Sequence, residues 1–288
     1  MQMGKMALLA VLLAIAGGAP AAPQAVVDTV QMPAWLDRGG ETRPLAIGTE
    51  IKNGDKLRTG RAGRAYLKLA DGSTVKLGEA ATLGFYSLSL RPERRLKGAL
   101  DVLSGAFRFT TQAVHRSGGN TEMDIRVGAV TAGIRGTDVW GKSDPERDLV
   151  CLIEGRVALV HAGASSAMEE PLSYVVVPKK APVLLHYRVD AEQLRSWARE
   201  TEVLAGDGAA RRGGKWKLLL GSADEEAKAL ELYDRARSAG YAAQIRQRDV
   251  GGKWNYEVLI AQLGSELEAG VLASRVRADL GLDASPAR

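Results

Sequence analysis

From Val26 to about Val183, short runs of alternating apolar and polar residues are interrupted by turn residues about every nine positions. Residues 65–69 and 74–77 are two such runs, and Asp71-Gly72 lies between them. An Asp-Gly pair favours a tight hairpin turn because that turn needs a positive φ. Alternating side chains point to opposite faces of a strand, so this pattern predicts a half-buried antiparallel sheet. The sequence therefore predicts an all-β domain over residues 26–185.

The same reasoning predicts two local features further along this domain. Residues 149–153 and 157–160 flank Glu154-Gly155-Arg156, which predicts another hairpin. In the segment 134–138, we expect Arg135 and Asp138 to pair and to fix a corner, with Gly136 giving the backbone its freedom.

The first residues have the pattern of a secretory signal peptide, assigned to residues 1–21. Lys5 precedes the apolar run 6–16, and Ala19-Pro20-Ala21 supplies small residues at the cleavage-site spacing. The apolar run is much shorter than the roughly 20 residues that span a bilayer, although an uncleaved membrane anchor is the alternative. We therefore expect an exported, periplasmic protein with no transmembrane segment in the mature chain.

The composition excludes several kinds of chemistry. The chain of 288 residues has 1 cysteine and 3 histidines, which rules out a disulfide scaffold and a cysteine-based metal cluster. Cys151 lies in an apolar strand pattern and is expected to be a buried, inert thiol. We expect no enzyme activity, no metal and no cofactor. An enzyme whose acid and base converge from distant strands stays open as an alternative.

The second half of the chain changes pattern. Residues 186–204 are expected to form a bridging helix capped by Asp190, and the glycine-rich residues 205–214 an interdomain linker. Residues 215–288 then follow the order β-α-β-β-α, with Ser222 capping the first helix and at most a stub of a last strand at 282–284, before Pro286. This order predicts an α+β domain of the split βαβ type, with both helices on one face of an antiparallel sheet.

A long series of motifs in the β half resembles the FecR domain, over about residues 45–160. The motif residues, all expected to be structural, are Gly54, Asp55, Gly60, Asp71, Gly72, Arg135, Gly136 and Asp138. The resemblance implies a mainly β, solenoid- or roll-like domain in a bacterial envelope protein. The members that give the family its name relay a signal to a sigma factor. Here we expect only the extracytoplasmic module, which would serve in sensing or protein interaction.

The tail resembles the SPOR domain, a peptidoglycan-binding module with a ferredoxin- or RNP-like fold. The match includes the motif from Trp216 to Ser222 and the strand from Tyr256 to Ile260. Members of that family bind glycan strands on the open face of the sheet. The corresponding candidate residues here are Lys217, Leu219, Arg246, Arg248, Glu257 and Leu259.

Two hypotheses follow for this face. In the first, the tail binds peptidoglycan and presents the β domain, as part of a non-enzymatic envelope protein. In the second, Leu219 and Leu259 form an apolar spot that packs on the β half or on another envelope protein, in a periplasmic regulatory component. The expected face carries no aromatic residue, which argues against nucleic acid as a partner.

Overall fold

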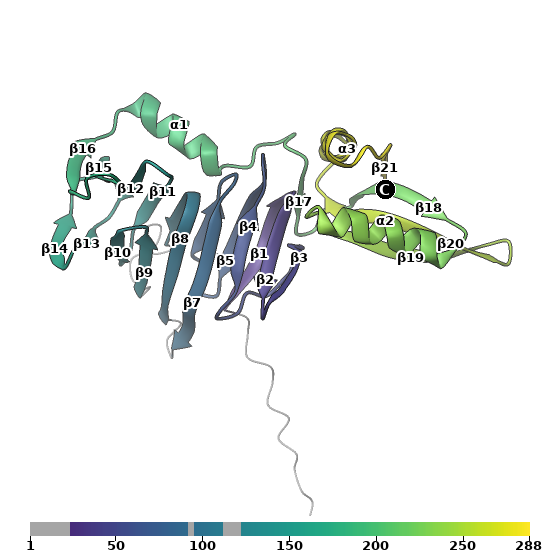
Figure 1. Ribbon diagram of the computed structural model, residues 1–288, viewed down its shortest axis with the longest axis horizontal. Coiled ribbons are helices and arrows are strands. Elements are labelled where there is room, and N and C mark those ends of the chain that lie inside the picture. Colours follow the sequence, from purple (N-terminus) through teal and green to yellow (C-terminus); the bar gives the residue numbers. More distant parts are fainter. Residues whose placement is uncertain (1–23, 92–94, 112–121) are drawn as a thin grey trace, which may run out of the picture.

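The computed structural model describes residues 24–91, 95–111 and 122–288, and the predicted signal peptide lies outside these ranges. A unit made of strands comes first, helix α1 follows, and a unit of strands and helices forms the tail (Figure 1). In the described ranges, no helix has the length and apolar character needed to cross a membrane.

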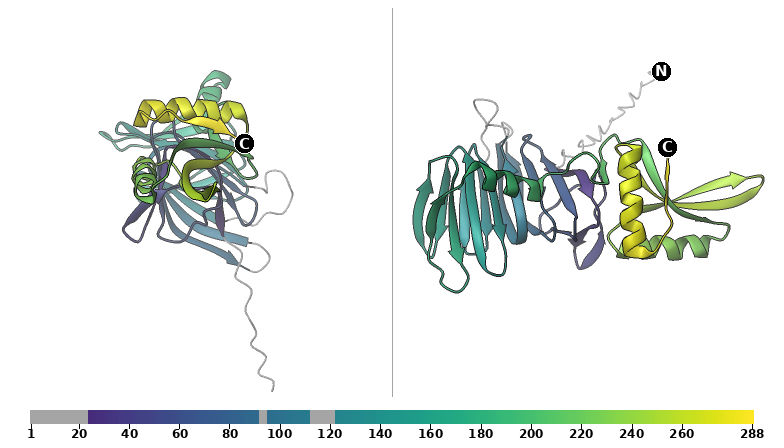
Figure 2. Two further views of the ribbon diagram at one scale, coloured as in Figure 1. Left: turned by 90° about the vertical axis from the view of Figure 1, so that its right-hand side faces the viewer. Right: turned by 90° about the horizontal axis from the view of Figure 1, so that it is seen from above.

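The strands of the first unit form two sheets that face each other. Within each sheet, the strands follow one another along the length of the unit (Figure 2). The first sheet has the spatial order β16 (Leu185–Arg188), β15 (Ser173–Pro178), β12 (Arg147–Glu154), β11 (Asp138–Ser143), β8 (Arg95–Thr110), β6 (Thr74–Leu77), β5 (Arg64–Leu69) and β1 (Ala25–Gln31). The second sheet has the order β14 (Ala164–Met168), β13 (Val157–His161), β10 (Val130–Ile134), β9 (Glu122–Val127), β8, β7 (Thr82–Arg91), β4 (Lys56–Thr59), β2 (Ala34–Arg38) and β3 (Glu41–Pro44). All these pairs are antiparallel except β8 with β9.

The apolar half of each alternating run lies between the two sheets. Leu67, Val75 and Phe107 of the first sheet are fully buried, as are Leu57 and Leu83 of the second. Because a strand's side chains alternate strictly, the pairing register decides which residues become core. The predicted mainly β architecture is thus confirmed, and so is the hairpin at Asp71-Gly72, where Gly72 has a φ of 88°.

Strand β8 crosses from one sheet to the other at Gly105. The part of β8 before this point pairs with β7, and the part from Gly105 onward pairs with β11. Gly105 has a φ of +77°, and a Cβ added there would lie 2.4 Å from the Cα of Ala81. Only glycine satisfies both the backbone angle and the close approach.

We therefore expect Gly105→Ala to lower the free energy of unfolding by about 3 kcal/mol, since strain and overpacking add. Gly54→Ala is the matched control, because Gly54 has a φ of +87° but nothing within 4 Å of an added Cβ. It should cost only about 1 kcal/mol. Urea unfolding measures the free energy of unfolding of both variants. Equal decreases of this free energy in the two variants would contradict a packing role for Gly105.

The second predicted hairpin is wrong. β12 lies in the first sheet and β13 in the second, so Glu154-Gly155-Arg156 is a corner between sheets. Gly155 has a φ of +94°, and a Cβ there would lie 2.5 Å from the carbonyl oxygen of Gly136. A hairpin turn and a corner between sheets both need a positive φ, so the local sequence does not separate them.

The predicted pair of Arg135 and Asp138 is also wrong. Asp138 accepts hydrogen bonds from Arg108, from Nε to Oδ1 at 2.9 Å and from Nη2 to Oδ2 at 2.6 Å, and from the Thr110 hydroxyl. Arg135 is exposed. The strand register of β8 and β11 places Asp138 directly opposite Thr110, which gives the long-range partner the better geometry.

Helix α1 (Ala191–Thr201) is shorter than the predicted bridging helix, and residues 186–188 belong instead to β16. Asp190 caps it as expected, accepting hydrogen bonds from the backbone of Glu192 and Gln193. α1 lies across the outer face of the first sheet, where Trp197 stacks on Trp140 with ring centroids 4.9 Å apart. Offset and stacked aromatic pairs add about 1 kcal/mol to the area they bury.

Glu202, directly after α1, connects the helix to three strands of the first sheet. Its carboxylate accepts hydrogen bonds from Lys76 Nζ at 2.6 Å, Arg108 Nη1 at 3.3 Å and the Tyr66 hydroxyl at 3.1 Å. Burial opposes the charged form, but the hydrogen bond from Lys76 and the nearby cations outweigh it and lower the pKa of Glu202.

A lowered folded-state pKa means that Glu202 stabilises the fold above its unfolded value of about 4.3, and that this contribution disappears as the pH falls through the folded value. We expect Glu202→Gln to cost about 2 kcal/mol at pH 7 and progressively less as the pH falls below about 4.3. Thermal unfolding across this pH range measures the difference. Glu154→Gln, at an exposed carboxylate, should show no such pH trend.

The tail contains β18 (Trp216–Ala223), α2 (Glu226–Ser238), β19 (Ala243–Val250), β20 (Lys253–Leu263), α3 (Glu266–Leu280) and β21 (Ser285–Ala287). Its strands have the spatial order β21-β18-β20-β19 and are all antiparallel, which is the predicted split βαβ arrangement. Two details differ. Glu225, not Ser222, occupies the N-cap of α2. The last strand comes later than expected and includes Pro286, which an edge strand tolerates.

The expected linker is wrong, because residues 205–214 contain strand β17 (Ala209–Arg211). β17 pairs with β1 of the first sheet and, through Ala210, with β20 of the tail. Ala209 and Ala210 are buried, and the buried carboxylate of Glu268 accepts hydrogen bonds from the backbone of Gly206 at 3.0 Å and Ala209 at 2.9 Å. Small residues typical of a flexible linker here fill a narrow gap between two packed units.

Candidate functional site

The structure brings the six glycan-binding candidates together on one face of the tail sheet. Leu219 lies directly opposite Leu259, and Arg246 lies opposite Glu257. Lys217 and Arg248 follow by alternation along β18 and β19. The other face carries Leu218, Val258 and Ile260, which are buried in the same core as α2 and α3. We call the face with the six candidates the open face; its residues are Lys217, Leu219, Arg246, Arg248, Glu257 and Leu259.

The centre of the open face is apolar but small. Leu259 is only 3% exposed, and Leu219 is half-buried directly opposite it. The predicted apolar spot thus exists, yet neighbouring side chains cover most of it. It forms the floor of a polar surface and not a large exposed patch.

The charges of the open face are only partly neutralised. Arg248 Nε lies 3.0 Å from Glu257 Oε2. Among the described residues, Lys217 and Arg246 have no ion-pair partner. A surface with two free cations, hydrogen-bonding groups and a shallow apolar floor suits an uncharged or anionic polymer with many hydroxyl groups.

The FecR motif residues other than the exposed Arg135 have structural roles. Asp55 is buried and accepts hydrogen bonds from Arg38 and from the Lys52 backbone, and Asp71 accepts one from the Ser73 backbone at 2.9 Å. The glycines lie where a positive φ or a close neighbouring atom disfavours a side chain. Gly54, Gly72 and Gly136 have positive φ, and a Cβ at Gly60 would lie 2.8 Å from Pro33.

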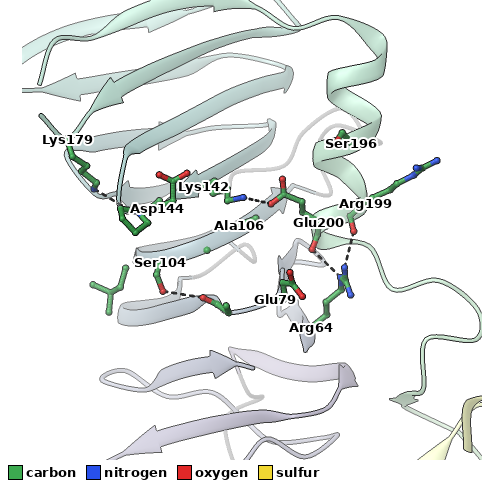
Figure 3. A pocket seen from close by; sticks show the side chains of 15 residues that line it. Arg64, Glu79, Ser104, Ala106, Lys142, Asp144, Lys179, Ser196, Arg199 and Glu200 are labelled. Atoms are coloured by element: carbon green, nitrogen blue, oxygen red, sulfur yellow. Dashed lines mark hydrogen bonds and ion pairs between the residues drawn. The ribbon is translucent and has the colours of Figure 1, made fainter. Parts of the chain in front are cut away.

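A groove of about 850 Å³ lies between α1 and the rim of the first sheet (Figure 3). Most of its charged groups are engaged with one another or with the main chain. Lys142 Nζ lies 2.8 Å from Glu200 Oε2, and Arg64 donates to the carbonyl oxygens of Arg199 and Glu200. No local pattern in the sequence indicates this groove, because its walls come from α1 and from several strands far apart along the chain.

The described histidines lie apart from each other and from Cys151. His161 is held by the carbonyl oxygens of Ala129 and Pro182, His186 lies on β16, and His115 lies outside the described residues. No cluster of metal-ligating side chains occurs in the described part of the chain. Cys151 is fully buried, and burial raises the pKa of its thiol to about 12, with Asp138 adding to the shift.

We expect Cys151 to resist thiol reagents while the protein is folded, because the thiolate is the reactive form. A coloured disulfide reagent at pH 8 should label less than a tenth of the protein within an hour, and all of it in about 6 M guanidinium chloride. Rapid labelling of the folded protein would contradict the buried position.

Comparisons with known proteins identify the β unit. The family described as FecR protein matches residues 55–158, so the predicted FecR domain is confirmed for this part of the chain. No curated protein matches. Two crystal structures of a proposed anti-sigma factor from Parabacteroides distasonis are similar, at 12% and 13% identity with TM-scores of 0.42 and 0.40. Both similarities cover 78% of this chain, and 91% and 92% of the respective structures. The SPOR resemblance of the tail stays a prediction.

Proposed function

We propose that this chain is an exported, non-enzymatic protein of the bacterial cell envelope. Its tail binds peptidoglycan glycan strands, and its FecR domain serves as a sensing or protein-interaction module in signal transduction. The observation that carries the proposal is the convergence of Lys217, Leu219, Arg246, Arg248, Glu257 and Leu259 on one uncovered sheet face.

The chemistry of the open face supports a glycan ligand. Sugar hydroxyls need hydrogen-bonding groups, which Arg246, Lys217 and Glu257 supply, and the apolar face of a sugar ring suits the half-buried Leu219. The face is continuous across β18, β20 and β19, so it offers an extended surface and not a closed pocket. An extended surface fits a polymer better than a small molecule.

The joint between the two units supports a coupled role. Arg275 of α3 donates to the carbonyl oxygens of Met32 at 2.8 Å and of Asp207 at 3.1 Å. Trp35 Nε1 donates to the carbonyl oxygen of Ser238 at 3.3 Å, and Ala34 donates to that of Gly240. A tail fixed in this way would set the orientation of the FecR domain relative to any polymer that the tail binds.

The alternative function is a periplasmic regulatory component whose tail sheet packs on a protein. The neighbouring side chains Leu219 and Leu259 favour it, because apolar sheet centres are common in protein interfaces. Arg246 and Arg248 of the open face are exposed and so are accessible to a partner molecule.

A binding assay with purified sacculi tests the glycan proposal. We expect Arg246→Glu and Leu219→Asp each to weaken sacculus binding about tenfold, because they place a negative charge on the open face. Lys228→Glu on the exposed side of α2 is the matched control and should bind as the unaltered chain does. Sedimentation with sacculi at physiological salt measures all three variants.

Two outcomes would contradict this proposal. If the unaltered chain does not sediment with sacculi, the tail does not bind peptidoglycan. If it sediments but both open-face variants bind normally, the binding surface lies elsewhere. Circular dichroism of each variant shows whether it keeps the fold, so that a folding defect is not mistaken for a binding defect.

A further inference from the structure

A basic hollow lies where the FecR-containing unit meets the tail. It has a volume of about 280 Å³, and its charged lining consists of Arg38, Arg43, Lys52, Arg237 and Glu50. The first three cations belong to the strands and loops around β2 and β3, and Arg237 belongs to the end of α2, which reaches β3 (Figure 1). Docking of the two units therefore completes the hollow, because it adds Arg237 to a lining that otherwise belongs to the first unit.

Two of its arginines are held in place before any ligand binds. Arg38 donates from Nε and Nη2 to the buried carboxylate of Asp55 at 2.7 and 2.5 Å, and from Nη2 to the Glu50 carbonyl oxygen at 2.8 Å. Arg237 donates from Nη1 to the carbonyl oxygen of Ala243 at 3.4 Å, and its guanidinium lies 4.9 Å from the ring centroid of Tyr233. Side chains ordered in advance lose little entropy when they bind a ligand.

The charge of the hollow is not balanced by its own residues. Asp55 neutralises Arg38, and Glu50 is the carboxylate that lines the hollow. In the described part of the chain, Arg43, Lys52 and Arg237 have no carboxylate partner. Clustered cations without partners repel one another, and an anionic ligand would relieve this repulsion.

The hollow lies close to the edge of the tail sheet. Ala46 lines the hollow and also lines a separate narrow gap beside Gln244 and Ala261. Gln244 lies on β19, the strand that carries Arg246 and Arg248 of the open face. A chain lying along β19 toward Gln244 would thus approach the hollow.

We propose that the hollow, which we call the junction site, binds an oxyanion, a carboxylate or a phosphate, carried by the extended polymer that occupies the open face. Arginine guanidinium groups recognise both oxyanions through paired N–H···O hydrogen bonds. That the oxyanion belongs to the polymer on the open face rests on the proposed function, but the affinity of the junction site for an oxyanion does not. Occupation of this site would join the FecR-containing unit and the tail through the ligand.

The test uses the double variant Arg43→Glu/Lys52→Glu, which changes exposed residues and leaves the contacts of Arg38 and Arg237 intact. Lys180→Glu/Arg195→Glu, with the same change in charge at exposed sites away from the junction, is the matched control. Binding of inorganic phosphate, of an oligogalacturonate and of a neutral chitin oligosaccharide is measured by calorimetry at low salt, with sacculi as the fourth arm.

We expect the double variant to lose about tenfold in affinity for the oligogalacturonate or for phosphate, whichever the unaltered chain binds, and the control to lose less than twofold. Neutral oligosaccharide should not distinguish the two variants. If neither oxyanion binds the unaltered chain, or if the double variant binds them normally, the junction site is wrong.

The sacculus arm separates this inference from the proposed function. If sacculus binding depends on Arg246 but not on Arg43 and Lys52, peptidoglycan binding stands and the polymer does not reach the junction site, which overturns the inference. If sacculi do not bind while phosphate or oligogalacturonate still binds in an Arg43- and Lys52-dependent way, the proposed function fails and the oxyanion site stands.

Discussion

The buried carboxylate of Glu268 is the contact on which the arrangement of the two units depends. It accepts hydrogen bonds from the backbone of Gly206 and Ala209 and so fixes the segment that leads into β17. An unpaired carboxylate at 3% exposure would be costly, so this segment has little freedom to leave. Because β17 pairs with both β1 and β20, the first sheet of the β unit continues into the tail sheet. The position of the open face and the completion of the junction site both follow from this continuity.

A second set of contacts ties helix α1 to the β unit just before that segment. Trp197 stacks on Trp140, and Glu202 accepts hydrogen bonds from Tyr66, Lys76 and Arg108 on the outer face of the first sheet. These contacts cover an aromatic surface that the alternation of the strands leaves outside the main core. The chain is thus held to the outer surface of the first sheet immediately before it enters β17. Together, α1 and β17 make the connection between the units an ordered part of the fold.

Much of the β unit and of the tail was predictable from local sequence, because the signals there are short-range. The Asp71-Gly72 turn, the Asp190 cap and the β-α-β-β-α order all depend on residues close together in the chain. The shared face of the six open-face residues was predictable as well, since alternation within each strand fixes it once the strands pair. The predictions that were wrong concern positions where one local signal is compatible with more than one long-range arrangement. Gly155 turns a corner between sheets, and Asp138 pairs with Arg108 across two strands and not with nearby Arg135.

The sequence by itself determined most of the strands, helices and turns, and which half of each of these strands is apolar, because periodicity and backbone propensity are local properties. Only the tertiary structure decided how the two units meet. The small residues 205–214 are compatible with a flexible linker in isolation, and become a buried strand only when β1, β20 and Glu268 surround them. The junction site has the same origin, since Arg38 and Arg237 are far apart in the chain and converge only through this docking. Burial and hydrogen bonding between distant segments determine how the two units meet, and no local pattern encodes these interactions.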